Sequence, residues 1–317
     1  MRALRIKHME VLLAVAAAGS MQRAAEVINL TQPAISKLIG EIEAMFGTAL
    51  FRRSKLGVTL TESGQALVER VQFLLNDLAH TQAEIAAIDR GMIGCLRIGA
   101  LPVAECAILP QSLRTLHQQA PALRIQIEEG TRSALLALLR RGEIDCVIGR
   151  LDVGSQENGL YCEPLVQLPV LLVTAVNHPL ASRQTVTLED LTAYPWVLPR
   201  IGAPIRTVID ALFVNAGLAK PMPLIESTSI WLNQELLEAS DLIGVMSKAA
   251  ATSYASQGRL AILPINVSEN LPQVGVMMRQ APASRAMSAF LTVLREQTGA
   301  PPPGPLSVLT GATLGKV

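Results

Sequence analysis

Two polar side chains near the N-terminus stand four residues apart, a spacing at which they could read a nucleic-acid base together. Gln32 and Ser36, with Gly40 after them, fall on one face of a helix, and Lys37 lies beside Ser36. Glutamine can form two hydrogen bonds to an adenine edge, serine can bond several bases, and glycine allows close approach. This face favours base recognition in a major groove, although a helical hairpin with a solvated face would show the same residues.

The apolar pattern of residues 31–46 predicts the helix that carries this face. Thr31 is expected to be its N-cap, and Pro33 falls in the first turn, where its missing N–H removes no hydrogen bond. Ser20 is expected to cap a shorter helix upstream. Two short helices joined by a tight turn predict a helix-turn-helix. The apolar residues at helical spacing are Ile35, Leu38, Ile39, Ile42, Met45 and Phe46.

A basic segment, "GTALFRRSKLGVTLTESG", follows this helix. Arg52, Arg53 and Lys55 stand around a predicted hairpin turn at Gly57, as in the wing of a winged helix-turn-helix. Such charges would meet phosphates, although a run of charge is usually only a solvated surface. Residues 1–60 hold eight Lys or Arg against four Asp or Glu, while the whole chain is only +1. Basic charge concentrated in one segment of a neutral chain favours nucleic-acid binding.

The segment "AAEVINLTQPAISKLIGEIEAMFGTALFRRSKLGVTLTESG" resembles the N-terminal signature of LysR-type transcriptional regulators in order and spacing. The resemblance implies a bacterial transcription factor that is dimeric or a dimer of dimers. It also implies promoter DNA, RNA polymerase and a small-molecule effector as partners. The residues expected to bind DNA are Ser20, Thr31, Gln32, Pro33, Ser36, Lys37, Arg52, Arg53 and Lys55.

Residues 61–90 have the pattern of one long helix with a narrow apolar seam. Thr61 is expected to cap its start, and Gly91 and Gly94 to end it. An amphipathic helix packed on its own domain would be one explanation. A seam sustained over three heptads favours pairing with a second copy, hence a dimer, and in the family this is the linker helix. The seam, with one polar interruption, is Leu67, Val71, Leu74, Leu78, Thr81, Ile85 and Ile88.

After Gly94, short apolar runs alternate with helical stretches, which predicts an α/β fold with largely parallel sheets. The segment resembles the two-lobed periplasmic-binding-protein fold of LysR effector domains. The predicted domains are a winged helix-turn-helix (1–60), a linker helix (61–90), an effector domain (91–299) and a flexible tail (300–317). Lobe one would comprise 91–165 and 267–299, and lobe two 166–266. The apolar runs are 96–98, 123–127, 144–148, 171–176, 196–198, 242–246 and 260–263.

Ligands of such sheets bind outside the carboxyl ends of strands, at helix N-termini, and this rule selects the expected effector site. Hydroxyls and free N–H groups at helix starts, with one or two arginines, favour a small carboxylate. Each residue also has a plainer explanation as a helix cap or a solvated side chain. The runs "IGRLD" and "LPRIGAP" weakly resemble regulators of aromatic-acid and sugar catabolism. The expected effector-binding residues are Leu101, Pro102, Val103, Thr131, Ser133, Arg150, Arg200, Thr228, Ser229 and Met246.

Catalytic and metal chemistry find little support in the sequence. His8, His80, His117 and His178 are scattered, and neither a phosphate-binding loop nor a GxSxG motif occurs. The four cysteines are widely spaced, with no CxxC pair, which suits a reduced cytoplasm. A redox-sensing cysteine pair stays an alternative. We therefore expect a protein that is not an enzyme and has no cofactor or metal.

Membrane and export functions are also disfavoured. Half the residues are hydrophobic, but no apolar run has membrane-spanning length. The start "MRALRIKHMEVLLAVAAAGSM" could suggest a signal peptide, yet His8 and Glu10 interrupt it and it continues into the helix-turn-helix. An exported solute-binding protein would not need the first ninety residues. The sequence predicts a cytoplasmic regulator that responds to an effector, with a ligand-independent DNA-binding regulator as the alternative.

Overall fold

The computed structural model describes residues 4–54, 57–88, 94–151, 159–267, 271–280 and 283–300. Lys55 of the predicted wing, Gly91 and residues 301–317 of the predicted tail lie outside the described residues. The chain divides into two compact units, one of residues 1–99 with 122–147 and the other of residues 100–121 with 148–317.

The first unit begins with three helices and a two-stranded hairpin. Buried side chains of all three helices and of β1 form one core, because each helix is apolar on a single face. On α3, Ile35, Ile39 and Ile42 are fully buried, so the opposite face is free. The elements are α1 (Ile6–Ala18), α2 (Met21–Val27), α3 (Gln32–Phe46), β1 (Phe51–Ser54) and β2 (Gly57–Leu60).

Two of the three helix caps predicted in residues 1–61 form in the structure. Ser20 accepts a hydrogen bond from the Arg23 amide at the start of α2, and Thr61 accepts one from the Gly64 amide at the start of the linker helix. Thr31 occupies the N-cap position of α3, but its side chain makes no capping hydrogen bond. The expectation of a hydroxyl cap there was wrong, and Pro33 is what favours the helix start.

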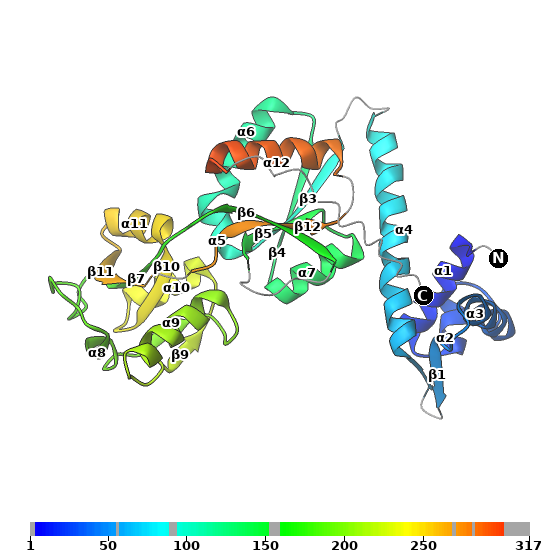
Figure 1. Ribbon diagram of the computed structural model, residues 1–317, viewed down its shortest axis with the longest axis horizontal. Helices are drawn as coiled ribbons and strands as arrows, with labels where there is room; N and C mark the ends of the chain where they lie inside the picture. The colour runs from blue at the N-terminus through cyan, green and yellow to red at the C-terminus, as the bar shows by residue number, and fades with distance from the viewer. Residues whose placement is uncertain are drawn as a thin grey trace, which may run out of the picture. The chain divides into compact units, whose positions relative to one another are not determined.

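The linker helix α4 (Glu62–Ile88) is the long helix of the first unit (Figure 1), and its apolar residues fall into two differently packed segments. Near its start, Leu67 and Val71 pack into the core of the winged domain. Farther along, the seam residues Leu74, Leu78 and Ile85 are 48%, 42% and 57% exposed. Packing on its own domain therefore accounts for the first part of the seam only.

The rest of the first unit lies against the linker helix. It contains most of β3 (Cys95–Ala100), β4 (Arg124–Glu129) and α7 (Arg132–Arg141). The side-chain amide of Asn76 donates to the backbone carbonyl of Arg141 over 2.7 Å. Next to it, Gly142 ends α7 with a φ of 74°, and a Cβ at this position would approach the Phe73 ring to 3.0 Å. A glycine thus permits both the helix end and the close packing.

One five-stranded sheet, here called the first sheet, has the order β4-β3-β5-β12-β6. Helices α6 and α12 lie side by side (Figure 1), joined by a hydrogen bond from Gln297 to Thr115. Arg295 of α12 donates two hydrogen bonds to the buried carboxylate of Glu163 on β6. The elements not yet located are α5 (Pro102–Ala107), α6 (Leu109–Gln119), β5 (Cys146–Arg150), β6 (Leu160–Val166), β12 (Val274–Arg279) and α12 (Arg285–Thr298).

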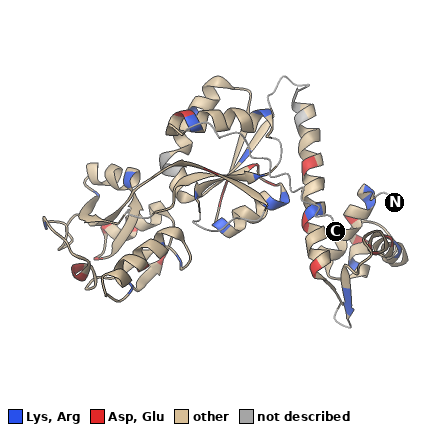
Figure 2. Ribbon diagram, in the orientation of Figure 1, with Lys and Arg blue, Asp and Glu red and all other residues tan. Residues whose placement is uncertain are grey.

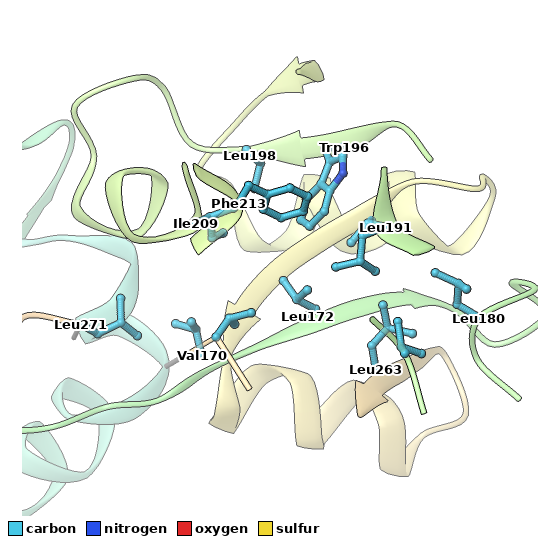
Figure 3. Packing of buried hydrophobic residues seen from close by; sticks show 13 residues of the cluster. Val170, Leu172, Leu180, Leu191, Trp196, Leu198, Ile209, Phe213, Leu263 and Leu271 are labelled. Atoms are coloured by element: carbon cyan, nitrogen blue, oxygen red, sulfur yellow. The ribbon is translucent and has the colours of Figure 1, made fainter. Parts of the chain in front are cut away.

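The second sheet has the order β11-β7-β10-β8-β9. Its core includes Trp196 and Phe213, whose rings meet edge to face at 5.8 Å (Figure 3). Its elements are β7 (Val170–Ala175), α8 (Leu188–Leu191), β8 (Trp196–Leu198), α9 (Pro204–Asn215), β9 (Pro223–Glu226), α10 (Ile230–Glu238), β10 (Ile243–Ser247), α11 (Lys248–Ser256) and β11 (Leu260–Asn266).

The strand directions correct one expectation from the sequence. Strand β8 is parallel to β9 and β10, but β7 is antiparallel to β10 and β11, and β12 is antiparallel to β6. The sheets are mixed rather than largely parallel. Strand β7 enters the second sheet from β6 of the first sheet and not through a helical crossover from a strand of its own sheet, so it is not constrained to run parallel to its neighbours.

Candidate nucleic-acid interface and effector-binding edge

The predicted reading face of α3 is open in the structure. Gln32, Lys37 and Gly40 are exposed and Ser36 is half-buried. They lie beside the stripe of Ile35 and Ile39, which the core fully buries, and remain accessible at its edge. An exposed helix face whose first turn carries an amide and whose second carries a hydroxyl can donate to and accept from base edges.

The basic hairpin beside this helix forms as the sequence predicts. Strands β1 and β2 pair antiparallel, with Arg52 opposite Thr59 and Arg53 opposite Val58. Both arginines are exposed, and Figure 2 shows the basic residues along β1. The guanidinium of Arg53 donates to the Ser36 hydroxyl over 3.4 Å, which links the wing to the reading face of α3.

Two contacts that sequence reasoning missed position this wing. One carboxylate oxygen of Glu43, near the end of α3, accepts hydrogen bonds from the backbone amides of Leu50 (2.8 Å) and Phe51 (3.3 Å). On the other strand, the Val58 amide donates to the Gly19 carbonyl over 2.9 Å. The partners of Glu43 lie beyond a turn, so no local pattern identifies them. The wing is held to α3 at one strand and to the end of α1 at the other.

In the second sheet, the carboxyl ends of the parallel strands β8, β9 and β10 lie at the same edge of the sheet. Leu198 of β8 is paired with Glu226 of β9, and the Ser227 amide donates to the Leu198 carbonyl over 3.0 Å. Counting on from these pairs puts Arg200 level with Thr228, and both side chains are exposed. This edge therefore presents a cation and a hydroxyl from neighbouring loops.

Two helices of nine residues also begin at this edge. Ser229 caps α10 by accepting from the Leu232 amide over 3.3 Å. Ser247 ends β10 and caps α11 by accepting from the Ala250 amide over 3.3 Å, and the next residue, Lys248, is exposed. Sequence reasoning missed Ser247 and Lys248, although their place after an apolar run was the available signal. Helix N-termini and cations together can bind an anion.

Two of the predicted effector residues, Met246 of β10 and Arg150 of β5, are buried. The Met246 side chain lies in a core cluster with Val173 and Val197. Arg150 is 4% exposed, and its guanidinium donates to the carbonyls of Pro272 (2.8 Å) and Leu168 (2.6 Å). Burial lowers the pKa of Arg150 to about 10. Effector binding by either side chain stays a prediction, because packing alone accounts for both positions.

The predicted residues at the start of α7 and of α5 have mixed environments. Thr131 caps α7 by accepting from the Ala134 amide over 3.4 Å, and its hydroxyl lies 3.2 Å from that of Ser133. Leu101, Pro102 and Val103 are half-buried where α5 begins. Their role as effector contacts also stays a prediction.

Two further titratable residues, His8 and Cys95, have structural hydrogen-bond partners. His8 faces the Glu41 carboxylate at 3.3 Å, and Cys95 donates to the Gln126 side chain over 3.3 Å. In the described part of the chain, no group of three His, Cys, Asp or Glu could hold a metal ion. No helix within the described ranges is long and apolar enough to span a bilayer. The Cys106 side chain lies outside the described residues.

Comparison with known proteins identifies both parts of the chain. Residues 6–65 match the family described as "Bacterial regulatory helix-turn-helix protein, lysR family", and residues 89–299 match the "LysR substrate binding domain". The HTH-type transcriptional regulator GalR of Pseudomonas putida is 29% identical over 296 residues, which is 92% of this chain and 74% of that protein. The regulator YdcI of Escherichia coli K12 is 32% identical over 277 residues, which is 87% of this chain and 90% of YdcI.

A solved structure shares the fold over most of this chain. Full-length CbnR in complex with its target DNA superposes with a TM-score of 0.64, at 21% identity, covering 93% of this chain and 100% of CbnR. The relatives are named as transcriptional regulators and not as enzymes. The two family matches together span most of this sequence, and the chain belongs to the LysR family of DNA-binding transcriptional regulators.

Proposed function

We propose that this regulator binds promoter DNA in the cytoplasm as a dimer of dimers, responds to a small carboxylate co-inducer and acts on RNA polymerase. In this scheme α3 reads bases through Gln32 and Ser36, while Arg52 and Arg53 contact phosphates. The open reading face and the hydrogen bond between Arg53 and Ser36 support this division of roles. A ligand-independent DNA-binding regulator is the alternative.

The exposed half of the linker helix supports the oligomer. Leu74, Leu78 and Ile85 follow each other at heptad-related spacing and remain exposed in a single chain. Large apolar side chains in a line on a helix are stabilised by burial against a second helix, at about 25 cal/mol for each square ångström covered. A second copy of α4 has the complementary pattern.

The observation that carries the co-inducer proposal is the strand edge of the second sheet. Arg200 and Lys248 supply positive charge, Thr228 and Ser229 supply hydroxyls, and α10 and α11 direct their free amide groups to the same edge. The positive charges, the hydroxyls and the free amide groups would each stabilise a bound carboxylate. Thr131 and Ser133, at the start of α7, stay effector contacts predicted from the sequence.

A thermal-shift screen of aromatic carboxylates, sugar acids and neutral sugars tests this proposal. A ligand that binds the native state at a hundred times its Kd stabilises it by about 2.7 kcal/mol. Under our proposal a carboxylate raises the melting temperature, while its amide or neutral sugar counterpart does not. A screen in which neutral sugars alone stabilise the protein would refute the carboxylate, and no stabilising compound would favour the ligand-independent alternative.

Substitution of the edge residues then locates the site. Ser229→Val removes a hydroxyl and should weaken binding of the stabilising carboxylate roughly fivefold to tenfold, the usual net effect of one hydrogen bond. Ser284→Val is the matched control, because Ser284 caps α12 in the same way, accepting from the Met287 amide over 3.2 Å. Equal losses of affinity in both variants, measured by calorimetric titration, would assign the effect to lost helix capping.

A further inference from the structure

The chain passes between its two sheets twice, through two short segments. Residues 167–169 lead from β6 of the first sheet to β7 of the second, and residues 267–273 lead from β11 of the second sheet back to β12 of the first. We call these the crossover segments; the second is described at residues 267 and 271–273. Any movement of one sheet relative to the other must be accommodated here.

One buried side chain joins both crossover segments. Arg150 is the last residue of β5, in the first sheet, and is 4% exposed. One of its terminal nitrogens donates to the carbonyl of Leu168 and the other to the carbonyl of Pro272, at 2.6 and 2.8 Å. These partners are 18 and 122 residues away in the chain.

Further hydrogen bonds connect the same three pieces of chain. The Gln167 side-chain amide donates to the Leu271 carbonyl over 2.7 Å, which joins one crossover segment to the other. The backbone amide of Leu151, directly after Arg150, donates to the Gln273 carbonyl over 2.8 Å. A fourth piece of chain, the start of α11, joins them, because the backbone amide of Lys248 donates to the Pro169 carbonyl over 2.9 Å.

The chemistry of this contact requires arginine. A guanidinium presents several N–H groups in a fixed planar fork, so that it can hold two carbonyls at a set separation. A lysine ammonium keeps the charge, but its three N–H groups rotate about one nitrogen on a flexible stem and cannot hold two carbonyls at a set separation. The burial of this cation is costly, and the charge-assisted hydrogen bonds to carbonyl oxygens offset that cost.

We propose that Arg150 is the positioning residue of the hinge between the lobes, which sets the spacing of the two crossover segments and so determines how lobe two can turn. This role is distinct from the effector contact that the sequence suggests for Arg150. Only its regulatory consequence rests on the proposed co-inducer response. The hinge itself can be tested with the full-length protein and no small molecule.

The test is hydrogen exchange in Arg150→Lys, with Arg206→Lys as the matched control. Arg206 is equally buried and also donates to two carbonyls, those of Pro199 and Pro221, but both are in lobe two. The reporters are the amides of Leu151 and Lys248, since each donates to a crossover segment. In Arg150→Lys both should exchange on the order of tenfold faster, with the strands of both sheets unchanged.

The urea dependence of exchange separates positioning from general stability. A local opening at the crossover segments exposes little surface, so the accelerated exchange should be almost independent of dilute urea. In Arg206→Lys the two reporters should keep their wild-type rates. Unchanged reporters in Arg150→Lys, acceleration that spreads through both sheets with strong urea dependence, or the same acceleration in Arg206→Lys would each overturn the proposal.

Discussion

Asn76 of the linker helix donates its side-chain amide to the backbone carbonyl of Arg141, at the last turn of α7, over 2.7 Å. The two residues are 65 positions apart, and Gln72 donates to the Asn76 side-chain oxygen over 3.2 Å, which orients the amide. Thr131, a predicted effector contact, is the N-cap of helix α7, and Arg141, which accepts this hydrogen bond, is the last residue of α7. One rigid helix therefore leads from a candidate ligand contact to the helix that carries the DNA-binding domain.

Asn76→Ala should loosen the contact between α4 and α7. The substitution removes the hydrogen bond to Arg141, which we expect to cost about 1 kcal/mol, and hydrogen exchange at the end of α7 should rise accordingly. Gln65→Ala is the control, because the Gln65 side-chain amide donates to Glu69 on the exposed side of the same helix. If the end of α7 exchanged at the same rate in both variants, the contact would have no energetic role in solution.

Gln32→Ala and Arg52→Ala should affect DNA binding differently. Loss of the Gln32 amide should cost about 1–3 kcal/mol at one base pair and relax the preference there. Loss of Arg52 should weaken binding to all sequences and reduce the steepness of its salt dependence, because fewer counterions are released. Fluorescence anisotropy with operator variants at several salt concentrations measures both effects.

A charge-matched control separates these roles from net charge. Lys220→Ala removes one exposed positive charge between α9 and β9, outside the winged domain. It should leave both the base preference and the salt dependence close to wild type. Identical behaviour of the Gln32 and Arg52 variants would contradict the assigned division between base and phosphate contacts.

Leu78→Asp should dissociate the proposed dimer. The charge would be buried without a partner between paired linker helices, at a cost of several kcal/mol. Sedimentation should show a smaller species, and operator affinity should fall. Gln82→Asp, an exposed position of the same helix beside the seam, should sediment as wild type does. A soluble Leu78→Asp protein of unchanged size would exclude pairing through this seam.

His178 should make stability depend on pH near neutrality. Its Nδ1 accepts from the Leu180 amide, so Nε2 carries the proton and donates to the Asp241 carbonyl. Burial lowers its pKa below the ordinary 6.5, against a smaller opposing effect of Asp241. Because the unfolded state then binds the proton more readily, the stabilisation is complete above 6.5 and is lost as the pH falls through the folded-state pKa.

Melting temperatures of wild type and His178→Asn, at about pH 7.5 and about pH 5.5, check this dependence. Asparagine can replace the Nδ1 acceptor but does not titrate, so the fall between the two pH values should be smaller in the variant. The control His117→Asn changes an exposed histidine on α6 and should behave as wild type. An equal fall in all three proteins would assign the pH dependence to other groups.

The parts of the fold that the sequence predicts are those encoded by local patterns. Helix α3, the hairpin at Gly57 and the start of α4 at Thr61 follow from apolar spacing, turn residues and a cap, all within a few positions. Strands β6, β9 and β12 were not anticipated. Strand β6 contains Glu163 and Pro164, and β9 is a four-residue edge strand, so neither has a clear apolar alternation.

The candidate sites show the same division. The reading face of α3 depends on helical periodicity and could be predicted. The positions of Glu43 and Arg150 depend on carbonyl or amide partners that meet them only in the folded chain, beyond a turn or across more than a hundred residues. An arginine after a strand has the same sequence pattern whether it faces a ligand or a buried carbonyl, so the sequence could not distinguish the two.

The tight packing at the start of the linker helix bears on how regulators of this kind can be recombined. A Cβ on Gly64 would overlap the Leu50 carbonyl oxygen, and Val71, two turns later, is 1% exposed within the core of the winged domain. The first turns of α4 are therefore part of the core of the DNA-binding domain and must stay with it. A chimera that joins this DNA-binding domain to another sensor domain should have its junction beyond Leu75. A junction at residue 60 would remove the α4 side chains that complete the core of the DNA-binding domain.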